Sequence, residues 1–152
     1  MVKILATLAA LMVGSTPALA QLRWCWRFAA SGMSAAGTIT TGKHADAEGF
    51  YQIAGITGTV DSATVTAMQP TGTAIPGNTG FPVDNLIRST APQLTKHGFG
   101  FADSDGAYHN PFHLEQYRDY ISLPPYANGK GAEPMIEFRA VSAASGSDCP
   151  TK

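Results

Sequence analysis

Charged side chains are scarce in this chain of 152 residues, because Lys, Arg, Asp and Glu together make up only 14% of it. Ten basic side chains are balanced by eleven acidic ones, and the formal net charge is −1. The basic residues form no cluster along the sequence, whereas binding to a nucleic acid or to an anionic membrane surface depends on such a cluster. We therefore expect neither partner for this protein.

The sequence also lacks an apolar run of about 20 residues, which is the length that a membrane-spanning helix needs. Ile4–Val13 is apolar over roughly half that length and follows a short basic start, as in the core of a secretory signal. Ala18-Leu19-Ala20 then forms a cleavage site of small residues. We predict a signal peptide over residues 1–20, cleaved after Ala20, and a single domain over 21–152 with no membrane span after cleavage.

Cysteine is rare, with only two residues, Cys25 and Cys149, close to the two ends of the expected exported chain. In an exported protein an even number of cysteines favours a disulfide. The sequence therefore predicts a bridge between Cys25 and Cys149. Two distant cysteines without clustered histidines do not make a metal site, and we expect neither a metal nor a cofactor.

Helical periodicity is missing as well, and period-two alternation takes its place. The clearest examples are a strand over 23–28, a β-hairpin over Phe50–Met68 that turns at Asp61-Ser62, and a last strand over 134–141. Seven to nine such short strands predict an all-β, antiparallel domain, either a sandwich or barrel-like. An outer-membrane barrel fits the length, but the chain lacks regular ten-residue alternating segments.

Shorter alternating stretches predict further strands, at 37–41, 83–88, 97–102 and 107–109. Pro111 is expected to interrupt the last of these, since proline cannot donate to a strand ladder. Three prolines and three glycines between Gln69 and Pro82 predict a long surface loop, and loops of this length are often functional. A flexible tail is expected from about residue 142.

Trp24, Trp26 and Phe28 share one face of the first predicted strand, because side chains alternate between the two faces. We expect this aromatic face to fill the core of the domain. The alternative is an exposed aromatic platform that stacks on sugar rings. An exposed pair of tryptophans is unusual on a soluble monomer, so solvent exposure decides between the two interpretations.

Five elements occur in an order that resembles a known group of proteins. They are Tyr51–Val60, Ala63–Thr66, Pro70 with Gly77-Asn78, Asp84–Ile87, and Leu94-Thr95 with Gly98–Phe101. This order is similar to that of small exported bacterial β-proteins, many of which carry a PEP-CTERM sorting tail. The resemblance covers about Trp24 to Val141 and implies the fold and export, but no catalytic residues. The chain ends without a Pro-Glu-Pro motif, so sorting through such a tail is not implied.

Catalytic motifs are also missing, since the sequence has neither a phosphate-binding loop nor a G-x-S-x-G elbow. His109 and His113 have the spacing of a helical metal pair, but Pro111 lies between them and favours two histidines in an exposed loop. Asp103-x-Asp105-Gly106 resembles the start of a calcium loop, but its spacing fits a hairpin turn better. We therefore predict no catalytic residues and no metal ligands.

The leading functional hypothesis is an exported, non-enzymatic β-domain that acts by binding or by structure in the envelope or extracellular space, with a glycan or another exported protein as ligand. One alternative is a small secreted hydrolase with a site assembled from distant His and Asp or Glu residues. Another is an inhibitor or immunity-type partner of another exported protein. The candidate ligand contacts are aromatic and histidine side chains: Trp24, Trp26, Tyr108, His109, His113, Tyr117 and Tyr120.

Overall fold

The computed structural model describes residues 21–30, 32–78, 80–117, 119–123, 135–143 and 148–149. The predicted signal segment therefore lies outside the described residues, as does the tail apart from Asp148 and Cys149. The described chain is all-β, with one short 3₁₀ helix and no α-helix in these ranges. Its elements are β1 Leu22–Ala30, β2 Met33–Thr41, β3 Tyr51–Val60, β4 Ala63–Met68, β5 Leu86–Ile87, β6 Phe101–Asp103, β7 Tyr108–Leu114, η1 Glu115–Tyr117, β8 Asp119–Leu123 and β9 Met135–Ala143.

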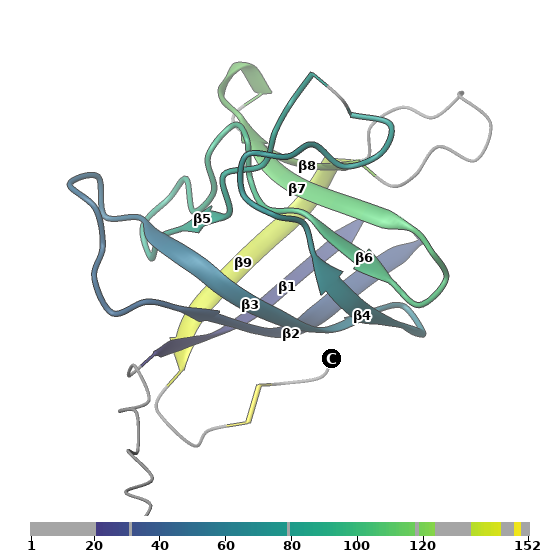
Figure 1. Ribbon diagram of the computed structural model, residues 1–152, viewed down its shortest axis with the longest axis horizontal. Coiled ribbons are helices and arrows are strands. Elements are labelled where there is room, and N and C mark those ends of the chain that lie inside the picture. Colours follow the sequence, from purple (N-terminus) through teal and green to yellow (C-terminus); the bar gives the residue numbers. More distant parts are fainter. Residues whose placement is uncertain are drawn as a thin grey trace, which may run out of the picture.

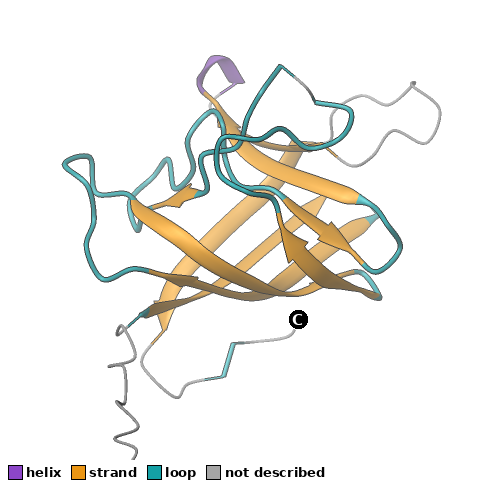
Figure 2. Ribbon diagram, viewed as in Figure 1, coloured by secondary structure: helices purple, strands orange, loops and turns teal. Residues whose placement is uncertain are grey.

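Eight of the strands follow one another around a barrel, in which every neighbouring pair is antiparallel. The ring runs β1-β2-β3-β4-β6-β7-β8-β9 and returns to β1 (Figures 1 and 2). The short β5 pairs with the first two residues of β3. The predicted all-β antiparallel class is confirmed, and the architecture is barrel-like. Closing a sheet on itself leaves few unpaired strand edges.

Aromatic side chains fill the interior of the barrel. Trp24 and Trp26 are each 2% exposed, so the interpretation that this face of β1 fills the core is confirmed and the sugar-stacking platform is wrong. The ring of Trp26 lies 6.1 Å from that of Phe99 and 5.6 Å from that of Phe101, measured between centroids. Each indole N–H has a partner, because Trp24 donates to Thr41 Oγ1 and Trp26 to the carbonyl of Thr57. Paired polar ends let these large rings be buried without an unsatisfied donor.

Glycines make room where β2 and β3 come close together. Gly37 lies opposite Gly58 in the register of β2 and β3, and opposite Trp26 in that of β1 and β2. A Cβ added at Gly37 would collide with the backbone oxygen of Thr57. The two bare backbones thus allow the approach that lets the Trp26 indole reach across β2 to β3.

Three predicted segments look different in the structure. The hairpin over Phe50–Met68 is confirmed, but β3 and β4 form only two ladder pairs before β4 turns to β6. The strand predicted over 83–88 is wrong except for Leu86–Ile87, because Asn85 has a positive φ of 54°. The last strand is confirmed and runs on to Ala143, two residues into the predicted tail.

The prediction that Pro111 interrupts its strand is also wrong, since β7 runs through it. The N and C=O of one strand residue point to the same side, and the Pro111 carbonyl accepts from the amide of Phe99. The missing donor therefore points toward the β6 side, where regular pairing has already ended at Phe101 and His109. The ladder between β7 and β8 is consequently complete opposite Pro111.

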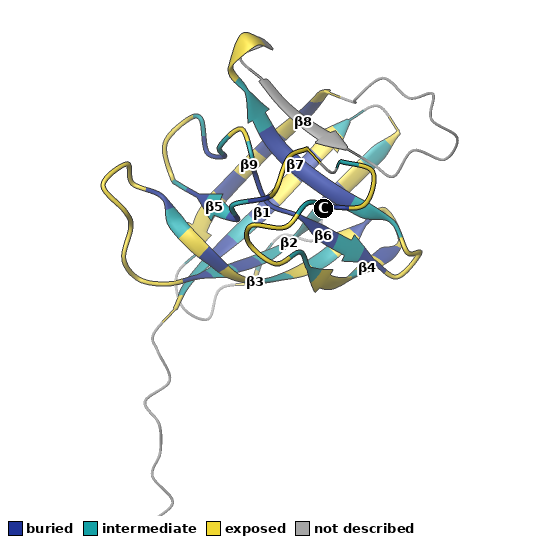
Figure 3. Ribbon diagram, turned by 45° about the horizontal axis from the view of Figure 1, so that its top comes forward, coloured by how far each residue is buried: buried dark blue, intermediate teal, exposed yellow. Residues whose placement is uncertain are grey.

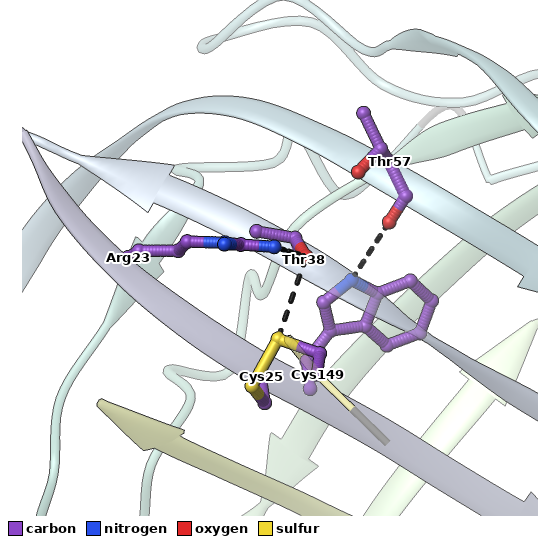
Figure 4. Close-up of a disulfide and its surroundings, with 6 residues drawn as sticks. Arg23, Cys25, Thr38, Thr57 and Cys149 are labelled. Carbon is purple, nitrogen blue, oxygen red and sulfur yellow. Dashed lines mark hydrogen bonds between the residues drawn. A yellow bond between two sulfur atoms is a disulfide. The ribbon is translucent and has the colours of Figure 1, made fainter. Parts of the chain in front are cut away.

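The predicted disulfide is confirmed. Cys25 and Cys149 are bonded and close a loop with a sequence separation of 124. Cys25 points outward from β1, between the inward tryptophans, so the bridge holds Cys149 against the outside of the barrel. Figure 4 shows Thr38 of β2 beside it, where the hydroxyl donates to Cys149 Sγ at 3.4 Å and accepts from Arg23.

Replacing both cysteines by serine should lower the free energy of unfolding by about 3–5 kcal/mol, since the unfolded chain then loses the constraint of a long closed loop. Urea titrations of the oxidised wild type and of the Cys25→Ser/Cys149→Ser variant measure this difference. A reducing agent should bring the wild type to the midpoint of the variant and leave the variant unchanged. Equal midpoints for the oxidised wild type and the variant would contradict the prediction.

Candidate functional site

A buried amide, Asn85, holds the loops at one end of the barrel together. Its side chain is 0% exposed, and Nδ2 donates to the carbonyl of Gln69 at 2.8 Å and to Thr71 Oγ1 at 3.0 Å. Oδ1 accepts from the amide of Gly100 at 3.2 Å. Its backbone carbonyl accepts from the amide of Ile53 in β3 at 2.8 Å. One residue therefore joins β3, the start of the long loop and the approach to β6.

The described residues of the long loop predicted over Gln69–Pro82 contain no strand, as expected, and the loop is folded onto the barrel. Ile75 is buried and packs with Phe112 on the outer face of β7. The amide of Gly72 donates to the carbonyl of Val83 at 2.8 Å and fixes the two ends of the loop to each other. Phe81 is 58% exposed on this anchored loop. The loop therefore presents an aromatic ring to solvent from a fixed backbone, above the buried β7 seen in Figure 3.

The remaining candidate contacts fall in different environments. Tyr108 lies on the outer face of β7, half-buried in the small apolar cluster beneath the long loop. His113 is half-buried at the far end of the same strand. The side chains of Tyr117 and Tyr120 lie outside what the structure describes. Tyr108 is thus the candidate contact that lies next to the exposed surface of the Gln69–Pro82 loop around Phe81, which we call the loop surface.

His109 forms a buried pair with Asp103, so its prediction as an exposed loop histidine is wrong. Nε2 lies 2.8 Å from Asp103 Oδ2 and donates to it, because an ionised carboxylate can only accept. The imidazole also stacks on Phe101, with ring centroids 5.0 Å apart. Asp103 Oδ1 accepts from the amides of Asp105 and Ala107, which confirms the predicted hairpin turn.

The electrostatics of Asp103 follow from these contacts. Burial by itself raises the pKa of this carboxyl, but the bond from His109, the two turn amides and the positive charge of the imidazole outweigh it and lower the pKa below its ordinary value of 3.8. Both side chains of the pair are 4% exposed. Because the pair lies inside the barrel, it contributes to stability and does not face a substrate in solution.

A second polar cluster joins Asp84 to Thr95. The Thr95 hydroxyl donates to Asp84 Oδ2 at 2.6 Å and accepts from the amides of His97 and Gly98. Burial raises the pKa of Asp84, despite the hydrogen bonds from Thr95 and from the amide of Leu86 and the nearby charge of His97. The Thr95 oxygen is occupied by three hydrogen bonds, so this cluster clamps the loop and offers no free nucleophile.

A groove runs along β9 on the side away from β1. It has a volume of about 510 Å³ and is lined by Ser89, Ala91 and Gln93 of the loop before β6 and by residues 138–142 of β9. Gln93 spans it, because Nε2 donates to the carbonyl of Ala140 at 2.7 Å and Oε1 accepts from the amide of Ala140 at 2.9 Å. This side chain makes the two bonds that a neighbouring strand would make.

Sequence reasoning missed both buried amides. For Asn85 a signal existed, because Asn is one of the few residues that readily adopts a positive φ, and its presence argued against a strand over 83–88. For Gln93 we find no such signal, since a glutamine between Pro92 and Leu94 carries no periodicity. Its partner Ala140 lies 47 residues away.

Within the described ranges, no three His, Cys, Asp or Glu side chains gather closely enough to hold a metal ion. In the same part of the chain, no helix has the length and apolar character needed to cross a bilayer.

Replacing Asp103 by asparagine should lower the free energy of unfolding at neutral pH by about 1–3 kcal/mol, because His109 loses its charged acceptor. The lowered pKa of Asp103 means that its stabilising effect is present above pH 3.8, the value of the unfolded chain, and is lost as the pH falls through the lower folded value. Urea titrations across the acid range should therefore show a shallower loss of stability for Asp103→Asn than for the wild type.

The control for this experiment is Asp105→Asn, which changes an exposed carboxylate of the same turn. It should reproduce both the stability and the acid dependence of the wild type. The interpretation of the buried pair is contradicted if Asp103→Asn keeps the acid dependence of the wild type.

Comparison of the chain with protein-family models, with curated proteins and with solved structures finds no match.

Proposed function

We propose that the protein is an exported binding domain that contacts a glycan or another protein through its loop surface and does not catalyse a reaction. The barrel is the scaffold in this proposal, and its interior is occupied by packed aromatic rings. Binding residues are often found on loops that a rigid scaffold positions. The resemblance to small exported bacterial β-proteins agrees with the same proposal.

Export is supported by the disulfide between Cys25 and Cys149, since such bonds persist in oxidising compartments such as the periplasm or the extracellular medium. The apolar segment at residues 1–20 supplies the signal in this proposal, with a mature chain that begins at Gln21.

The observation that carries the proposal is the position of Phe81. This ring is 58% exposed, yet its loop is fixed by buried residues, by backbone hydrogen bonds and by the Asn85 amide. Ordering the loop in advance reduces the entropy that binding would otherwise cost. An exposed aromatic ring on a fixed backbone can stack on a sugar ring or enter an apolar pocket of a protein.

The hydrolase alternative is supported less well by the geometry. It needs a histidine beside a carboxylate in a concave site that a substrate can reach. The structure does bring His109 beside Asp103, but inside the barrel. The alternative of an inhibitor or immunity-type partner uses the same loop surface as our proposal, and the identity of the captured ligand distinguishes it.

The test compares the mature wild-type protein with Phe81→Ala in a glycan array and in capture from the native envelope and medium. The matched control is Met135→Ala, which removes another partly exposed apolar side chain, on β9. We expect Phe81→Ala to weaken retention of the specific ligand by about tenfold or more, as for a contact residue at the centre of an interface. Met135→Ala should retain the ligand as the wild type does.

Equal retention by Phe81→Ala and the wild type would contradict the role of the loop surface. Turnover of an arrayed glycan or peptide would contradict a purely binding function. Both variants should unfold within about 0.5 kcal/mol of the wild type, as expected for exposed side chains, so a loss of binding cannot be attributed to misfolding.

A further inference from the structure

β9 has a full partner on one side and a partial one on the other. It forms seven ladder pairs with β1, from Arg23–Ala143 to Ala29–Glu137. With β8 it forms only two pairs, at Ile136 and Met135. Beyond these two pairs, the side of β9 away from β1 has no strand beside it among the described residues. Among the described residues, the side of β9 beyond Ile136 is thus an edge where the strand ladder has ended.

The hydrogen-bonding groups of this open side point into the groove described above. Gln93 binds both the amide and the carbonyl of Ala140 from that side. Because N–H and C=O groups alternate between the two sides of a strand, those of Ser142 point the same way. The Gln93 side-chain amide thus takes the place of one residue of a neighbouring strand. The N–H and C=O of Ser142 point to the same side of β9 as those of Ala140.

The loop opposite the edge is held firmly, so the groove has a fixed wall. Arg88 donates through Nε to the carbonyl of Pro92 at 2.7 Å and through Nη1 to that of Glu48 at 3.2 Å. Its guanidinium also lies over the ring of Phe50, 4.4 Å from the centroid. The contacts of Arg88 therefore hold the loop that forms this wall in place.

Two arginines lie on the outer face of the sheet near the groove, and one of them, Arg139, lines it. Arg27 and Arg139 lie directly opposite each other in the register of β1 and β9, and both are exposed. Two like charges in this position destabilise a sheet slightly. Among the described residues, neither guanidinium forms an ion pair with a carboxylate. Glu137 is the only acidic residue of β9. An acidic ligand would relieve this repulsion.

We propose that the groove binds an extended, acidic polypeptide segment of a partner protein, which adds to β9 as an antiparallel strand. The segment takes over the two bonds that Gln93 makes to Ala140, pairs with the backbone of Ser142, and places its carboxylates beside Arg27 and Arg139. Exposed strand edges are established docking sites for extended peptides. A second copy of this chain fits less well, because its own β9 would bring another Arg139 close to Arg27 and Arg139.

The proposed site does not rest on the loop surface around Phe81, whose residues do not line the groove. The two proposals share only the idea that the outside of the barrel binds a partner. Either one can therefore fail without the other.

The test uses ¹⁵N-labelled mature protein and a capped heptapeptide of sequence Thr-Glu-Val-Glu-Val-Glu-Thr, at concentrations up to about 5 mM to reach weak affinities. We expect saturable shifts of the amide signals of Ala140, Val141 and Ser142. The same peptide with lysine in place of glutamate should bind at least about tenfold more weakly, because its charges are reversed. An acidic peptide N-methylated on alternate residues should not bind, since it lacks the donors that pair with β9.

Charge-reversal variants test the role of the two arginines. Arg139→Glu should weaken binding of the acidic peptide by several-fold and Arg27→Glu/Arg139→Glu by about tenfold. Lys96→Glu makes the same charge reversal as the single variant at an exposed residue outside the groove, and it should leave binding within about twofold of the wild type. Phe81→Ala should bind as the wild type does. Absence of shifts at β9, equal binding of both charge forms, or a dimer of the free protein that buries β9 would each overturn the proposal.

Discussion

The Asn85 amide is the constraint on which the loop end of this barrel depends. Its side chain is fully buried and bonds to Gln69, Thr71 and Gly100, while its carbonyl accepts from the amide of Ile53. A buried amide that loses its partners costs about 1–3 kcal/mol for each unsatisfied group. Four separate segments of chain therefore have one favourable arrangement, and the long loop takes a defined place on β7.

A buried side-chain amide joins a loop to a strand in a second place, where the ladder between β8 and β9 ends. Gln93 pairs with both polar groups of Ala140, where the ladder between β8 and β9 has already ended. In both places a side-chain amide replaces a backbone partner that strand pairing does not supply. Apart from the Asp103–His109 pair, the described interior of the barrel is mainly apolar and aromatic. The two amides connect loops to strands, and the rings fill the space between the strands.

Period-two alternation predicted most of the barrel, because it reports which face of a strand is buried. Trp24, Trp26 and Phe28 show this, as does the last strand with Ile136 and Phe138. Alternation failed at Asn85, where hydrogen bonds to distant segments favour a positive φ over a strand. Alternation does not mark sites that depend on long-range partners. Neither the contact of Gln93 with Ala140 nor the Asp103–His109 pair could be derived from spacing alone.

The proposed binding requires that the long loop is a fixed surface and not a mobile linker. Native-state hydrogen exchange of the wild-type protein tests this claim most directly, through the amides of Gly72 and Val83, which bond to Val83 and Thr73 across the loop. Both amides should exchange slowly, with opening free energies close to those of the barrel strands, if the loop is fixed. Exchange of these two amides at the rate of an unstructured peptide would contradict it.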